Sequence, residues 1–170
     1  MTQIWKETGF VDGDAWVIET EDRKAGEGEQ PLLPLDAFVR RAAETNEIGL
    51  GVLVAPADDV RALSPYLDRI ALVAVQFPAF NDGRGFSHAT LLRQRLGYDG
   101  EIRAVGDVLI DQVPLMLRTG FTSFAVSNPV AISRLKENRL PGIAERYQPG
   151  PVPSGEAVGF SWRRLGGGGA

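Results

Sequence analysis

The chain alternates between short apolar runs and segments in which apolar residues recur every three or four positions. Four of the apolar runs have the length and composition of buried strands: 49–54, 70–76, 102–105 and 121–126. The segments that follow them place their apolar residues on one face of a helix. Strands that alternate with helices at this spacing form parallel βα units with right-handed crossovers. The pattern therefore predicts an α/β fold built from about four parallel βα repeats.

Two architectures are compatible with this number of repeats. Four units are too few to close a complete barrel of the eight-stranded kind. One alternative is an open sheet that is covered by helices. The other is a half-barrel-like sheet, which self-association with a second copy of the chain would complete. The second alternative predicts a homo-oligomer, and the sequence pattern does not choose between the two.

The first nineteen residues contain strand-like composition on both sides of a turn. The apolar pairs Ile4-Trp5 and Phe10-Val11 precede the turn sequence at 12–14, and residues 15–19 again have strand composition. The turn contains Asp-Gly, a frequent hairpin turn because glycine accepts positive φ. We therefore expect an N-terminal β-hairpin around residues 12–14.

Two polar segments differ from the rest of the chain. Residues 21–33 are charged and contain two glycines, which is typical of an exposed loop. Residues 148–170 are rich in proline and glycine, which predicts an irregular tail. We expect a single α/β domain over residues 1–147, with an exposed loop at 21–33 and the tail over 148–170.

Composition and charge narrow the class of protein. The chain has 170 residues, of which 44% are hydrophobic and 24% charged, as in a soluble globular domain. Its net charge of -4 argues against general nucleic-acid binding, because phosphate contacts need a basic face. No apolar run approaches the roughly 20 residues that cross a bilayer, and the N-terminus lacks a signal-peptide pattern. We expect a cytoplasmic protein with no membrane or nucleic-acid partner.

The absence of cysteine limits the chemistry of the chain. It excludes thiol redox reactions, thiolate nucleophiles, and cysteine ligands to zinc or to iron–sulfur clusters. With a single histidine, His88, we expect no transition-metal site. His88 could act as a general base, but a helix position without a catalytic role is the favoured interpretation.

The most informative segment runs from residue 80 to residue 87 and contains a Gly-X-Gly turn between a predicted strand and a predicted helix. Exposed amides at a helix N-terminus favour an anion. Arg84 can make a bidentate pair with a carboxylate, a phosphate or a sulfur oxyanion. An equally weighted alternative is that Asp82 and Arg84 pair with each other and hold the loop. The candidate ligand-binding residues of this segment are Asp82, Gly83, Arg84 and Gly85.

A second polar group surrounds Arg103, which lies in an otherwise apolar predicted strand. A buried arginine needs a partner, which Asp107 or Asp111 could supply. We favour this structural ion pair over a ligand site, because structural networks pair charges as readily as sites do. In the functional alternative, Arg103, Asp107 and Gln112 face the same pocket as Arg84, at the carboxyl edge of the sheet.

Four aromatic residues lie near the Gly-X-Gly turn: Phe77, Phe80, Phe86 and Tyr98. They could form an apolar wall for a planar cofactor such as a flavin, although core packing is the more frequent role of such residues. The chain contains neither a Walker A loop nor a dinucleotide fingerprint. Flavin and NADPH stay as candidate cofactors on this basis, without a motif that selects either.

Several motifs occur in order: FNDGRGFS at 80–87, LRQRLGY at 92–98, GEIRAVGDV at 100–108, DQ at 111–112 and RTGF at 118–121. Over roughly residues 30–140 the chain resembles an uncharacterised bacterial family that is described as an oxidoreductase involved in sulfite reduction. The resemblance implies a cytoplasmic protein of assimilatory sulfate reduction and cysteine synthesis. It also implies sulfite reductase, or another enzyme of sulfur assimilation, as a partner.

The residues and the resemblance together give a functional hypothesis. We expect an accessory protein or an oxidoreductase of assimilatory sulfite reduction, which binds a small anion or a partner enzyme at the carboxyl edge of the strands. Redox chemistry would need a borrowed cofactor or partner, because the chain has no cysteine and no nicotinamide fingerprint. The alternative is a non-redox enzyme or binding protein for a phosphorylated metabolite, in which the same loop holds phosphate. Whether the chain is itself an enzyme is left open.

Overall fold

The computed structural model describes residues 2–79, 81–137 and 140, and the strands in this part of the chain form one eight-stranded sheet. The strands are β1 (Gln3–Lys6), β2 (Gly9–Val11), β3 (Trp16–Ile18), β4 (Gln30–Pro34), β5 (Leu50–Val54), β6 (Ile70–Phe77), β7 (Glu101–Gly106) and β8 (Ser123–Val126). Their order in the sheet is β2-β1-β8-β7-β6-β5-β4-β3. Strands β3 to β8 are parallel, whereas β1 is antiparallel to both of its neighbours.

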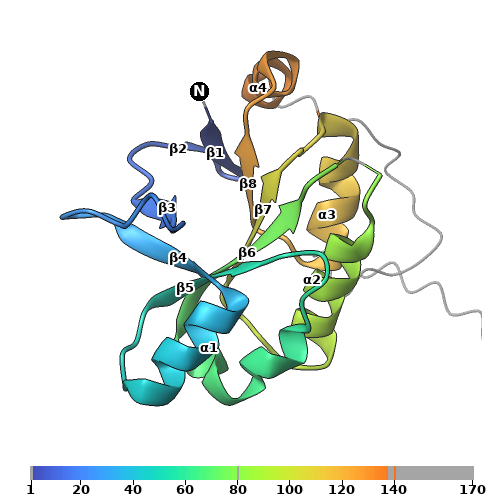
Figure 1. Ribbon diagram of the computed structural model, residues 1–170. Helices are drawn as coiled ribbons and strands as arrows, with labels where there is room; N and C mark the ends of the chain where they lie inside the picture. The colour runs from blue at the N-terminus through green and yellow to red at the C-terminus, as the bar shows by residue number, and fades with distance from the viewer. Residues whose placement is uncertain (1, 80, 138–139, 141–170) are drawn as a thin grey trace, which may run out of the picture.

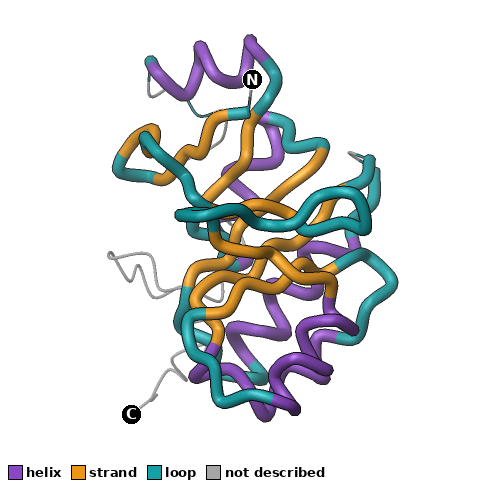
Figure 2. The backbone as a smooth tube through the Cα atoms, turned by 60° about the vertical axis from the view of Figure 1, so that its left-hand side comes forward, coloured by secondary structure: helices purple, strands orange, loops and turns teal. Residues whose placement is uncertain are grey.

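A helical segment follows each strand from β4 onwards. These segments are α1 (Leu35–Glu44), the 3-10 helix η1 (Val60–Arg69), α2 (Arg84–Gln94), the 3-10 turn η2 (Ile110–Gln112), α3 (Val113–Thr119) and α4 (Pro129–Lys136). The sheet curls into an open half-barrel, and α1, α2 and α3 lie along its outer side (Figure 1). Both views show α4 apart from these helices, at the end of the sheet where β1 and β2 lie (Figure 2).

Local sequence explains the form of several helices. Leu35, Phe38 and Ala42 recur every three or four residues in α1, and this buried face packs against the sheet. Pro65 lies inside η1, which takes the tighter 3-10 form. Proline has no N–H to donate, and its ring disfavours a regular α-helix there. Pro114 falls in the first turn of α3, where its missing N–H costs nothing.

The core consists of two layers, one on each face of the sheet. The outer layer, between sheet and helices, contains large, fully buried side chains such as Phe38, Phe77 and Phe124. The inner layer is smaller, and consists of Leu32, Leu72, Ala74 and Val105, with Trp16, Leu53 and Ala125 packed against them. Trp16 lies directly over Gly51, where a Cβ atom would overlap the indole ring. The concave side of the half-barrel is therefore partly filled by the chain itself.

Of the two architectures that the sequence pattern allows, the structure has the half-barrel-like one. The predicted strands correspond to β5, β6, β7 and β8, and they are parallel as predicted. An additional unit, β4 followed by α1, precedes them. The sheet as a whole is mixed, because β1 and β2 add antiparallel pairings at one edge. Completion of the half-barrel by a second copy stays a prediction.

The N-terminal hairpin exists, but its turn is not at residues 12–14. β1 pairs with β2 across a tight turn at Glu7-Thr8, so that Lys6 lies opposite Gly9. Gly9 has a φ of 121°, a conformation that side chains with a Cβ rarely adopt. β3 instead joins β4 at the other edge of the sheet, where Trp16 can pack over Gly51.

The prediction of an exposed loop over residues 21–33 is wrong at its C-terminal end. Residues from Gln30 onwards form β4, in which Leu32 and Leu33 are buried. Proline flanks this apolar pair on both sides, and because proline is depleted in strands the local sequence does not indicate a strand here. The predicted tail over 148–170 lies outside the described residues.

The two edges of the sheet are joined directly by the chain. Residues 12–15 connect the end of β2 to the start of β3, and these are the two edge strands. β2 runs in the same direction as β3, because β2 and β8 are both antiparallel to β1. The connection therefore runs back from the carboxyl end of one edge strand to the amino end of the other. A fully extended connection of this length spans at most about 17 Å, which limits the opening between these ends.

Candidate functional site

The carboxyl edge of the sheet, formed by the ends of β5 to β8, is held together by polar side chains. Asn128 follows β8 and caps α4, because its Oδ1 accepts hydrogen bonds from the backbone N–H groups of Val130 and Ala131 at 2.9 and 3.1 Å. His88, in α2, contacts the carbonyl oxygen of Pro56 through its Nε2 at 3.2 Å. This contact ties α2 to the loop after β5, which gives His88 a structural role.

Asp82 and Arg84 form a close ion pair in the loop after β6. The Nη2 and Nε of Arg84 donate to Oδ2 and Oδ1 of Asp82 at 2.7 and 3.0 Å, and the Arg84 backbone N–H donates to Oδ1 at 3.2 Å. These hydrogen bonds from Arg84 lower the pKa of Asp82, and the same pair raises the pKa of Arg84. The Arg84 side chain is 60% exposed, whereas that of Asp82 is 15% exposed. The loop is therefore pinned, with the guanidinium on the outside.

The two glycines of the turn, Gly83 and Gly85, have different structural roles. Gly83 occupies the N-cap of α2 with a φ of -79°, and no atom lies within 4 Å of the position that a Cβ would take. Gly85 packs so closely on the ring of Phe77 that a Cβ atom would overlap it. The turn therefore does not depend on positive φ. Gly85 is needed for close packing of α2 on β6, and Gly83 leaves the backbone at the start of α2 accessible.

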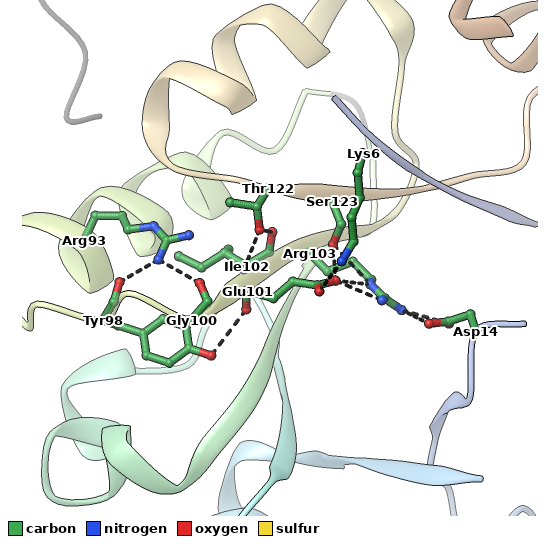
Figure 3. A network of polar contacts seen from close by, with 10 residues as sticks. All are labelled: Lys6, Asp14, Arg93, Tyr98, Gly100, Glu101, Ile102, Arg103, Thr122 and Ser123. Atoms are coloured by element: carbon green, nitrogen blue, oxygen red, sulfur yellow. Dashed lines mark hydrogen bonds and ion pairs between the residues drawn. The ribbon is translucent and has the colours of Figure 1, made fainter. Parts of the chain in front are cut away.

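A network of charges surrounds Arg103 on the inner face of the sheet (Figure 3). The Nη1 of Arg103 donates to both carboxylate oxygens of Asp14 at 2.9 and 2.8 Å, and its Nη2 donates to Oε1 of Glu101 at 2.9 Å. The Oγ of Ser123 donates to the same Glu101 oxygen at 2.6 Å, and the Nζ of Lys6 donates to Oε2 at 2.6 Å. Arg103 is only 4% exposed. Two cations and two carboxylates thus neutralise each other inside the half-barrel.

Hydrogen bonding decides the charge state of Glu101. Its burial would by itself raise the pKa of the carboxyl group, because a charged form is disfavoured away from water. The hydrogen bonds from Lys6, Ser123 and Arg103 favour the ionised form, and the pKa of Glu101 is lowered overall. The carboxylate is therefore ionised at neutral pH and acts as the centre of the network.

Arg103 has partners other than those that the sequence suggested. Asp14 and Glu101 hold its guanidinium, in place of Asp107 or Asp111. Asp14 could not be found from local spacing, because it precedes Arg103 by 89 positions. Glu101 could have been found, since residues two apart in a strand lie on the same face of the sheet. A structural ion pair at Arg103 is confirmed, with different carboxylates.

The predicted ligand-binding residues do not converge on one pocket. Arg103 lies on the inner face, and three residues, or about 10 Å, separate it from the end of β7. Asp107 follows that strand end, and its N–H donates to the carbonyl oxygen of Phe77 at 2.8 Å. Gln112 occupies the N-cap position of α3. The structure thus brings Asp82 and Arg84 together and leaves Arg103 in a separate network.

The aromatic residues near the turn belong to the core. Phe77 is fully buried and packs edge-on against Phe86, with ring centroids 5.4 Å apart. Tyr98 is buried near the opposite, amino end of the strands, where its hydroxyl donates to the carbonyl oxygens of Ile70 and Glu101 at 3.3 and 3.4 Å. Burial raises the pKa of Tyr98. Phe80 lies outside the described residues, and the others do not form a wall for a planar cofactor.

The exposed surface at the carboxyl edge of the sheet has two further features. A shallow groove of about 480 Å³ follows the outer side of α2 and starts within one turn of Arg84; it is lined by Phe86, Ser87, Thr90, Leu91, Gln94 and Arg95. Val130, in the first turn of α4 at the same edge of the sheet, is 60% exposed.

Over residues 2–79, 81–137 and 140, no group of three or more acidic or histidine side chains could hold a metal ion. None of the helices in the described ranges is long and apolar enough to span a membrane.

Comparisons with known proteins place the chain in a family. Searches of curated proteins and of solved structures give no significant match. A family model matches residues 51–154, which include all but the first residue of β5, the whole of β6, β7 and β8, the Asp82–Arg84 pair and Arg103. The chain therefore belongs to the family described as "Bacterial protein of unknown function (DUF934)".

Proposed function

We propose that this protein is an accessory component of assimilatory sulfite reduction, which binds a partner enzyme through the carboxyl edge of its half-barrel. The observation that carries the proposal is the presentation of Arg84, whose side chain is 60% exposed and held in place by Asp82. An arginine that is ordered before binding loses less side-chain entropy on binding than a free one. Arginine is also among the residues that contribute most to protein interfaces.

The Asp82–Arg84 geometry favours a protein partner over a small anion. A small oxyanion would have to compete with the carboxylate of Asp82, which already occupies the Nη2 and Nε donors of Arg84. A protein surface can instead bind the outer side of the guanidinium and contact its surroundings. The groove along α2 and the exposed Val130 offer such contacts, because they supply apolar area on the same edge.

The pathway assigned to the partner comes from the motifs over residues 80–121, which resemble the family linked to sulfite reduction. In this proposal, sulfite reductase or a neighbouring enzyme of sulfur assimilation carries the electrons and the cofactor. The accessory chain contributes binding and orientation, which is consistent with its lack of cysteine. The partner is therefore an enzyme that handles a sulfur oxyanion.

A binding measurement with purified components tests the proposal. Titration of the full chain into sulfite reductase from the same bacterium should give saturable binding, and Arg84→Ala should weaken it about tenfold or more. Arg41→Ala is the matched control, because Arg41 also makes two hydrogen bonds to one carboxylate, that of Glu47, at 2.9 Å each. That pair lies near the end of α1, at the opposite edge of the sheet.

A second pair of variants tests the apolar contacts. Val130→Ser should weaken binding, whereas Ile48→Ser should not, although Ile48 is 76% exposed. Ile48 precedes β5 and thus lies at the amino edge. Equal effects of Arg84→Ala and Arg41→Ala would contradict the assigned edge. Absence of binding, combined with a rise in melting temperature on addition of phosphate that Arg84→Ala abolishes, would favour the phosphorylated-metabolite alternative.

A further inference from the structure

The connection between the two edge strands, residues 12–15, has few attachments of its own. We call it the strap. In the described part of the chain, no backbone hydrogen bond joins Asp12, Gly13 or Asp14 to another residue, whereas Ala15 accepts one from the N–H of Gln30 at 2.7 Å. Residues 11–14 are exposed. Segments with exposed backbone and few hydrogen bonds open at lower free energy than core strands.

One side chain anchors the strap to the opposite wall of the half-barrel. The carboxylate of Asp14 contacts Nη1 of Arg103 through both oxygens, at 2.9 and 2.8 Å. Arg103 lies on β7, which is separated from the edge strands by β1 and β8 on one side and by β4, β5 and β6 on the other. The contact therefore crosses the interior of the curled sheet (Figure 3).

The network on Arg103 can survive the loss of Asp14. The Nη2 of Arg103 donates to Glu101 at 2.9 Å, and its Nε lies 3.3 Å from both Glu101 and the Oγ of Ser123. Glu101 also keeps its contact with Lys6. These partners belong to β7, β8 and β1, so they stay in place when the strap moves. Release of Asp14 therefore leaves the guanidinium paired and the central sheet intact.

The strap leads directly into the part of the inner layer that it helps to cover. Trp16 follows it, starts β3 and packs over Gly51 and Leu32. Movement of the strap would carry Trp16 away from Gly51, which has no side chain of its own to fill the space. Leu32, Leu72 and the other residues of the inner layer would then be exposed at the seam between β2 and β3.

We propose that residues 12–15 form a strap that opens as a unit while the central sheet stays folded, and that the contact between Asp14 and Arg103 is its fastening. The strap is thus a releasable cover over the inner layer of the half-barrel. Its side-chain fastening is a single pair of opposite charges, so loss of that pair should raise the population of the open state.

Hydrogen exchange of the full chain, measured by mass spectrometry, tests the strap. Asp14→Asn should accelerate exchange at β3, residues 16–18, and at the Gln30 N–H by about tenfold or more, without change in β6 and β7. Asp12→Asn is the matched control, because it removes a carboxylate from the same strap that makes no ion pair among the described residues, and it should leave exchange unchanged. Equal acceleration in both variants, or acceleration throughout the sheet, would overturn the proposal.

The unmodified protein provides a second test, which does not depend on how the variants fold. In low concentrations of denaturant, the Gln30 amide, which donates to the carbonyl oxygen of Ala15, should exchange through an opening of smaller free energy and smaller denaturant dependence than the amides of β6. If it exchanges only by global unfolding, with the same denaturant dependence as β6, the strap does not open separately and the proposal is wrong.

Discussion

Arg93, near the end of α2, holds the carbonyl oxygen of Gly120, which directly follows α3, through two hydrogen bonds from Nε and Nη2 at 3.0 and 2.8 Å. Its Nη1 donates to the carbonyl oxygens of Tyr98 and Gly100 at 2.6 and 2.8 Å. One guanidinium thus joins the ends of two helices and the loop that enters β7. The LRQRLGY and RTGF motifs of the sequence meet at this point.

Replacing Arg93 by lysine should destabilise the fold. A lysine ammonium cannot reproduce the planar arrangement of donors, so at least one of the three carbonyl oxygens loses its partner. We expect the free energy of unfolding, measured by urea denaturation, to fall by about 2 kcal/mol. Arg95→Lys is the control, because Arg95 is exposed and lies only two positions after Arg93. A similar fall in the free energy of unfolding in both variants would show that the hydrogen bonds of the Arg93 guanidinium do not cause the destabilisation.

Replacement by alanine should destabilise the protein more at Gly106 than at Gly97, although both glycines have positive φ. Gly106 has a φ of 95°, and a Cβ atom there would overlap the carbonyl oxygen of Phe77 in the neighbouring strand. Gly97 has a φ of 71° and no atom within 4 Å of its Cβ position. Gly97→Ala should therefore cost only the backbone strain, about 1–2 kcal/mol. Gly106→Ala should cost at least about 1 kcal/mol more in urea denaturation, because β6 and β7 must also separate. Equal costs would contradict the close approach.

Much of the central sheet could be predicted because its signals are local. β5, β6, β7 and β8 are predominantly apolar runs, and parallel strands buried on both faces have this composition. β4 escaped detection because Pro31 and Pro34 flank its buried Leu32 and Leu33. The pairing of β3 depends on the space above Gly51, which lies 35 positions after Trp16 and has no signature in the local sequence.

The candidate site shows the same distinction between local and distant contacts. The pairing of Asp82 with Arg84, one of two interpretations of the Gly-X-Gly turn, involves residues two positions apart and is present. The requirement of Arg103 for a carboxylate followed from its apolar surroundings. The identity of that carboxylate did not, because Asp14 reaches Arg103 only after the sheet has curled. The local candidate Asp107 lies beyond the carboxyl end of β7, whereas Arg103 lies within the strand.

Arg103 should contribute more to stability than the other cation of the network. Arg103→Met leaves Asp14 without its partner and removes one of the groups that neutralise Glu101. Removal of one member of a buried ion pair costs about 3–5 kcal/mol, which we expect as the loss in unfolding free energy. Lys6 is 35% exposed, and Lys6→Met should cost about 1 kcal/mol or less. The opposite ranking in urea denaturation would show that the buried guanidinium is not the main contributor.

The network should make stability depend on pH in the acid range through Glu101. Burial by itself raises the pKa of Glu101. The hydrogen bonds from Lys6, Ser123 and Arg103 together lower it by more than burial raises it, so the folded-state pKa lies below the ordinary value of 4.5. A lowered pKa in the folded state stabilises the protein above the unfolded-state value, and this contribution is lost as the pH falls through the folded-state pKa. Glu101→Gln should therefore be less stable than the unmodified protein at pH 7, and the difference should shrink below about pH 4.5. Urea midpoints measured from pH 7 down to pH 3 test this dependence, and a difference that widens on acidification would contradict it. Ser123→Ala removes one of the hydrogen bonds that lower the pKa of Glu101, so the acid-dependent loss of stability should be smaller in that variant and complete at a higher pH.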